Sequence, residues 1–154
     1  MRAKTILIFA VFLTLRAAAQ DTPKAKSHCN FPDGKTIGIT HVSEQAGTTE
    51  FATNESLVTV KGIGVPAGDY VVSPVKDSNN NWSLTMRKKA GKGISSELPP
   101  VPMSATTSDS PIEKLKVYFD PTGASCTMRW EMETSNILLS LEFTERNTDM
   151  PVLP

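Results

Sequence analysis

The chain has 154 residues with 16 basic and 16 acidic side chains, which gives a formal net charge of zero at neutral pH. This balance argues against a nucleic-acid-binding protein, because such proteins need a basic face to displace counterions from phosphates. Eleven prolines and nine glycines are many turn-forming residues for this length, and they favour short strands over long helices.

Residues 1–19 have the features of a signal peptide. Two basic residues precede an apolar run at 5–15, which is too short for a membrane span of about 20 residues. Ala17 and Ala19 match the small residues that signal peptidase accepts, so we expect cleavage after Ala19 and a secreted or periplasmic protein. Cleavage would leave 13 basic against 16 acidic residues. No second apolar run is long enough to cross a bilayer, so we expect a protein that is not membrane-spanning.

The first half of the remaining chain alternates between apolar and polar residues. Residues 20–27 contain no large apolar side chain and are expected to form a flexible arm. Period-two alternation and β-branched residues then predict strands, because successive side chains of a strand point to opposite faces. The expected strands are 35–41, 48–53, 57–61, 70–75 and a strand beginning at Trp82. Turn residues at 65–69 and 77–81 separate the later ones.

The second half contains the clearest pattern. Residues 88–111 are rich in proline, glycine and serine, and we expect at most one edge strand there, around 101–106. Three alternating stretches follow, at 114–119, 126–132 and 137–144, with two short turns between them. They predict an antiparallel meander with one apolar and one charged face. Residues 146–154 lack a pattern and are expected to form a flexible tail.

These elements together predict an all-β chain. The meander needs a second layer to cover its apolar face, and no stretch has the 3.6-residue period of an amphipathic helix. We therefore expect an antiparallel β-sandwich, jelly-roll-like, with about 7–9 short strands in a single domain over residues 28–145.

Cys29 and Cys126 are the two cysteines of the chain. An even number of cysteines in an exported chain predicts a disulfide. Free buried thiols and metal ligands are the alternatives, whereas the spacing excludes a Cys-x-x-Cys redox pair.

Several segments resemble an uncharacterised family of secreted bacterial domains. The matching segments are 29–35, Thr48–Thr53 with its Thr-x-Phe-x-Thr run, Val65–Tyr70 with Pro-Ala-Gly-x-Tyr, Trp82–Leu84, Phe119–Asp120 and Gly123–Trp130. The resemblance implies export and a β-sandwich, but no activity. Similar members carry a longer segment before the Thr-x-Phe-x-Thr run, and here that interval is only Val42–Thr48.

Candidate catalytic groups are sparse. His41 has no nucleophile at a spacing typical of a catalytic triad, and we expect it at the end of a strand. Glu131 and Glu133 are expected on one polar strand face about 7 Å apart, a spacing that hydrolytic acid pairs also have. Because Arg129 shares that face, a solvated surface is the simpler interpretation. No catalytic, metal-binding or cofactor-binding set is predicted.

The aromatic residues supply the remaining candidates. Trp82 and Trp130 share their strand faces with methionines and are expected in the core, with Trp130 near the disulfide. Tyr118 and Tyr70 are the candidate ligand contacts.

The leading functional expectation is therefore an exported, non-catalytic, monomeric domain that binds an envelope protein or has a structural part. A carbohydrate- or small-molecule-binding module is the alternative, and a hydrolase is the third.

Overall fold

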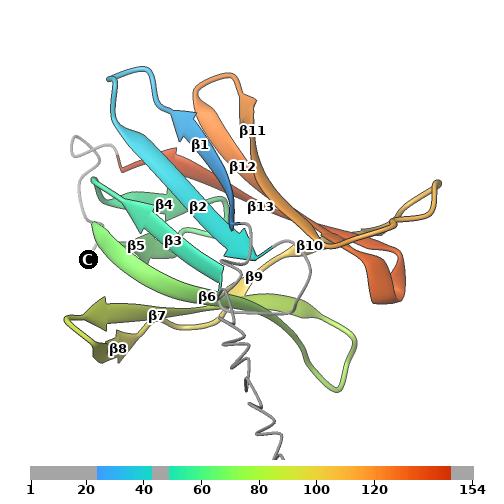
Figure 1. The fold of residues 1–154 in the computed structure, drawn as a ribbon. Helices are drawn as coiled ribbons and strands as arrows, with labels where there is room; N and C mark the ends of the chain where they lie inside the picture. Colours follow the sequence, from blue (N-terminus) through green and yellow to red (C-terminus); the bar gives the residue numbers. More distant parts are fainter. Residues whose placement is uncertain (1–23, 43–48, 147–154) are drawn as a thin grey trace, which may run out of the picture.

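The computed structural model describes residues 24–42 and 49–146, and these form two antiparallel sheets packed face to face (Figure 1). The antiparallel β-sandwich expected from the sequence is confirmed. In the first sheet the strand order is β1-β2-β3-β6-β7-β8, and β9 also pairs with β7. In the second sheet the order is β11-β12-β13-β4-β5, and β10 also pairs with β13.

The first sheet contains seven strands. Their bounds are β1 Lys24–Asn30, β2 Thr36–Val42, β3 Thr49–Thr53, β6 Gly68–Lys76, β7 Trp82–Ala90, β8 Gly93–Glu97 and β9 Val101–Pro102.

The second sheet contains six strands. Their bounds are β4 Leu57–Thr59, β5 Gly64–Val65, β10 Ser104–Thr107, β11 Lys116–Thr122, β12 Ser125–Met132 and β13 Ile137–Glu145, with a 3₁₀ turn, η1, at Glu133–Ser135 between the last two.

The number of strands exceeds the expected 7–9, because several short strands lie where the sequence has no alternation. The clearest is β8, whose five residues are all exposed. It forms by backbone pairing with β7 rather than by burial of a face. The expectation of a flexible arm at 20–27 is also wrong for its second half. Residues 24–27 begin β1 and pair with β2, where backbone hydrogen bonds hold polar side chains in a strand.

Pro74 lies within a strand and not at its end. β6 continues to Lys76, and Pro74 lies opposite Leu84 of β7. The described pairing of β3 with β6 reaches only Val72, so the missing N–H of Pro74 removes no bond of that ladder.

The core lies between the sheets and is built by the alternation that the sequence predicts. Ile37, Ile39 and His41 of β2 are buried together, as are Leu139, Leu141 and Phe143 of β13. An aromatic cluster joins the layers. Phe51 of β3 stacks on Phe143 with ring centroids 5.3 Å apart, and it lies 6.1 Å from Tyr70 and 6.2 Å from Phe119. Such pairs stabilise by about 0.5–1.5 kcal/mol each beyond their burial.

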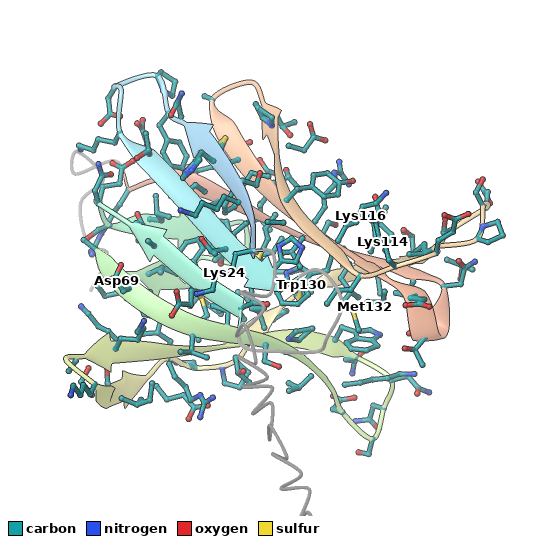
Figure 2. The ribbon with its side chains drawn as sticks, viewed as in Figure 1. Lys24, Asp69, Lys114, Lys116, Trp130 and Met132 are labelled. Atoms are coloured by element: carbon teal, nitrogen blue, oxygen red, sulfur yellow. A yellow bond between two sulfur atoms is a disulfide. The ribbon has the colours of Figure 1, made fainter. Side chains whose placement is uncertain are left out.

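The predicted disulfide is also confirmed. Cys29 of β1 is bonded to Cys126 of β12, so the bridge connects an edge strand of the first sheet to an inner strand of the second. Both cysteines are buried. Trp130, on the same face of β12, is 3% exposed and lies between the sheets, as predicted (Figure 2). A disulfide of this kind is typical of proteins in oxidising compartments.

Among the described residues there is no helix of sufficient length and apolarity to cross a membrane.

Candidate functional site

The two tyrosines proposed as ligand contacts have different surroundings. Tyr70 is fully buried, and its hydroxyl donates a 2.6 Å hydrogen bond to the backbone oxygen of Pro66. Burial raises the pKa of this phenol. The ring belongs to the aromatic cluster of the core, which corrects the expectation that it contacts a ligand.

Tyr118 remains at the surface, on the outer face of β11. Its hydroxyl donates a 3.1 Å hydrogen bond to Oε1 of Glu131, and Lys116 forms a 3.3 Å salt bridge with the other oxygen of the same carboxylate. Burial and then this hydrogen bond raise the pKa of the Tyr118 phenol. Figure 2 shows Lys114 and Lys116 beside β11. Both lysines and Glu131 line a hollow of about 350 Å³. Tyr118 does not line it but is hydrogen-bonded to Glu131, which does.

His41 and the pair of Glu131 and Glu133 were the two alternatives for hydrolysis, and His41 and Glu131 lie in different sheets. His41 lies in β2 and is 5% exposed, and desolvation lowers its pKa. Glu131 lies in β12 of the other sheet, where it is engaged by Tyr118 and Lys116. Glu133 begins the 3₁₀ turn after β12, so the expectation that Glu131 and Glu133 share a strand face is wrong. The chain leaves the strand at Met132 and turns back into β13.

A larger hollow, of about 770 Å³, lies where the edge of β13 is left open. β10 pairs with β13 as far as Ser140, and β4 begins to pair with the same strand at Phe143. Leu141 and Glu142 fall in the interval between these two partners, and both line the hollow.

The loop between β6 and β7 forms the opposite side of this hollow. The Asp77 carboxylate accepts hydrogen bonds from the backbone N–H groups of Asn79 at 2.8 Å and Asn81 at 2.9 Å. These bonds, with the Asn81 backbone contribution largest, lower the pKa of Asp77. Asn80 adopts a left-handed backbone with φ of 65°, which asparagine tolerates better than most residues. The loop is thus held in one shape and places Asn80 and Trp82 in the lining.

Trp82 is the aromatic residue of this groove, which we call the Trp82 groove. The indole is half-buried and packs against the edge of the core, while Lys76 Nζ lies 5.8 Å from the ring centroid. Val60, on the rim, is 60% exposed. The remaining lining is mainly polar: Lys61, Asp77, Asn80, Asn81, Ser83, Ser104, Thr127, Ser140 and Glu142.

This arrangement offers a ligand both apolar and polar contacts. A partly exposed indole and a valine offer an apolar surface, and amide, hydroxyl, ammonium and carboxylate groups surround it. The volume falls within the range of about 300–1,000 Å³ that is usual for small-molecule pockets, although the lining is more polar than in most of them.

The sequence did not reveal this groove. Leu84 and Met86, which alternate with Trp82, are fully buried, but Trp82 is only partly buried, so the expectation that Trp82 lies in the core is confirmed only in part. The indole differs because Trp82 is the first residue of β7, beside the loop. The turn at 77–81 was predicted from its residues. The gap beside β13 depends on where the pairing of β10 and of β4 with β13 ends, and no local sequence pattern indicates those positions.

The described residues thus define a disulfide-linked antiparallel β-sandwich with a polar surface groove. Comparison with known proteins adds no relative, because no protein-family model matches the chain and no curated protein or solved structure matches it significantly. The resemblance to a family of secreted bacterial domains therefore stays a prediction.

Proposed function

We propose that the chain is an exported, non-catalytic binding domain, and that the Trp82 groove takes a short carbohydrate. The observation that carries the proposal is a hollow of about 770 Å³ in which a half-buried indole is surrounded by polar side chains. A sugar ring has apolar C–H faces, which can pack on the indole, and polar hydroxyl edges, which can form hydrogen bonds with the surrounding side chains. Export is supported by the buried disulfide, since such bonds persist in oxidising compartments.

The indole has a specific part in this proposal. The cation of Lys76 already lies over its ring, which indicates an accessible π face. A sugar C–H face, which carries partial positive charge, would take a similar position. The amides of Asn80 and Asn81, which line the groove, would donate hydrogen bonds to ligand hydroxyls.

The test is titration calorimetry of the full chain, in its oxidised form, against short oligosaccharides of glucose, of N-acetylglucosamine and of peptidoglycan. We expect one of these classes to bind, and Trp82→Leu to weaken its binding at least tenfold. Leucine keeps an apolar contact with the core but removes the aromatic face. The matched control is Ile94→Lys, because Ile94 is a 47% exposed residue of β8 and does not line the groove. If none of these oligosaccharides binds, or if Trp82→Leu binds one as tightly as the wild type does, the carbohydrate proposal is rejected.

A second candidate function is suggested by β8. All five of its residues are exposed, and within the described residues it pairs with β7 alone. Such an open edge can accept a strand from another protein. This observation favours the expectation of an envelope-protein partner. Cross-linking in the envelope should then give an adduct that Ile94→Lys abolishes and Trp82→Leu retains. The reverse pattern would assign the partner to the groove.

A further inference from the structure

Three carboxylates meet where the chain passes from the first sheet to the second. Asp33 lies in the turn between β1 and β2, Glu55 lies in the crossover from β3 to β4, and Glu145 ends β13. One oxygen of each lies within 4.8 Å of one oxygen of each of the others. They line a hollow of about 440 Å³, and we call them the crossover carboxylates.

The nearby positive charge does not balance these three groups. Lys35 Nζ lies 2.9 Å from Oδ2 of Asp33 and 3.1 Å from Oε2 of Glu55. Its side chain is 51% exposed, so the ammonium reaches the cluster from the solvent side. Arg146 also lines the hollow but forms no salt bridge with a described residue. Lys35 is the one cation that pairs with these three carboxylates among the described residues, so the cluster keeps an excess of negative charge that a bound cation would reduce.

The burial of Glu55 is the second observation. This residue is 8% exposed, and while Oε2 contacts Lys35, Oε1 is buried and accepts no hydrogen bond. Oε1 of Glu145 is likewise buried without a donor. A buried carboxylate oxygen without a hydrogen bond destabilises the fold, because it loses its hydration and no protein donor replaces the water. Coordination to a cation would remove this cost for both residues.

We propose that Asp33, Glu55 and Glu145 together bind one calcium ion. The donors are all oxygens, the ligand type that hard cations prefer, and the set contains neither the imidazole nor the thiolate typical of zinc sites. Two oxygens that both bind one calcium ion at about 2.3–2.6 Å are at most about 4.6–5.2 Å apart, so three oxygens within 4.8 Å of one another are close enough to share one ion. Because the hollow is open, water molecules can complete the six to eight ligands.

The bound ion would connect the two sheets. Asp33 lies in a turn that joins two strands of the first sheet, Glu145 ends a strand of the second sheet, and Glu55 lies in the segment between the sheets. Such a site exists only in the folded chain, so calcium should stabilise the fold in proportion to its occupancy. The proposal is independent of the Trp82 groove, since the two sites share no lining residue.

The experiment uses the full oxidised chain after removal of metals by chelation. Calorimetric titration with CaCl₂ should give one site per chain, and the unfolding temperature should rise in a saturable way. Glu55→Gln and Glu145→Gln should each weaken calcium binding at least tenfold, whereas Glu113→Gln, an exposed acid outside the cluster, should not. Lys35→Met should tighten binding, because it removes the cation that competes for Asp33 and Glu55.

The proposal has clear ways to fail. No calcium-dependent change in either the wild type or Lys35→Met would overturn it. So would an unchanged calcium affinity in Glu145→Gln, which remains testable if Glu55→Gln does not fold. An equal rise of the unfolding temperature with MgCl₂ would overturn the assignment to calcium. An equal rise with NaCl at matched ionic strength would show that the stabilisation comes from charge screening, which would overturn the proposal of a binding site.

Discussion

Reduction of the Cys29–Cys126 bridge should remove a large part of the stability of this fold. The bridge joins residues 97 positions apart in the sequence. The loop-closure entropy of a cross-link of that length is worth about 4.7 kcal/mol at 25 °C, and measured losses for native disulfides are about 2–5 kcal/mol. We therefore expect the free energy of unfolding to fall by about 3–5 kcal/mol.

The structure also indicates which strand should be destabilised most when the disulfide is reduced. Among the described strands of its sheet, β1 is at the edge and pairs with β2 alone. The disulfide connects it to the second sheet, and a 2.9 Å hydrogen bond from the Phe119 backbone N–H to Ser27 Oγ is a further link between the sheets. Without the disulfide, the amides of β1 should exchange hydrogen faster than those of β6 and β7.

The assay is urea unfolding of the oxidised and the reduced wild type, because reduction breaks the bond and leaves the packed sulfur atoms in place. For a urea slope of about 2 kcal/mol per molar, the midpoint should fall by about 2 M. The matched control is the double variant Cys29→Ala with Cys126→Ala, which should not respond to reductant. Oxidised and reduced wild type with the same midpoint would refute the reasoning, because the bridge would then constrain nothing in the unfolded chain.

Two further predictions concern His41 and Asn136. Burial lowers the pKa of His41 below its ordinary value of 6.5, so the folded protein binds a proton here less readily than the unfolded chain. The free energy of unfolding should therefore fall as the pH drops below 6.5. Urea unfolding between about pH 8 and pH 5 should show a weaker pH dependence for His41→Leu than for the wild type, and an equal dependence would contradict the assignment. Asn136 has a left-handed backbone with φ of 49°, and its side chain accepts a bond from Ile112 N–H and donates one to the Ser108 carbonyl. Asn136→Ala should lose about 2–3 kcal/mol in urea unfolding, and Asn136→Gly about 1 kcal/mol less, because glycine avoids the left-handed penalty. Equal losses for both would mean that the backbone conformation is not strained in alanine.

Strands that cover the core could be predicted from the sequence because each carries its own alternation. β2, β7, β12 and β13 were expected close to their actual positions. β8 could not be predicted in this way, since all of its side chains are exposed and its order comes from hydrogen bonds to β7. β1 was missed for the same reason, because most of its side chains are polar and its partner lies further along the chain.

The candidate sites were harder to predict than the strands. Tyr70 and Tyr118 were both proposed as ligand contacts, yet only tertiary packing distinguishes them, with one ring inside the aromatic cluster and the other on an outer face. The crossover carboxylates come from positions 33, 55 and 145, and nothing near any one of them in the sequence indicates the other two.

The sequence by itself determined the all-β class, the apolar face of each main strand and the pairing of the two cysteines, because period-two alternation and cysteine count need no knowledge of distant neighbours. The tertiary structure alone decided which strands share a sheet, how far β10 and β4 extend along β13, and which polar side chains gather at the crossover. These features arise from hydrogen bonds and packing between segments far apart in the chain. Both candidate sites, the Trp82 groove and the crossover carboxylates, lie at junctions of that kind.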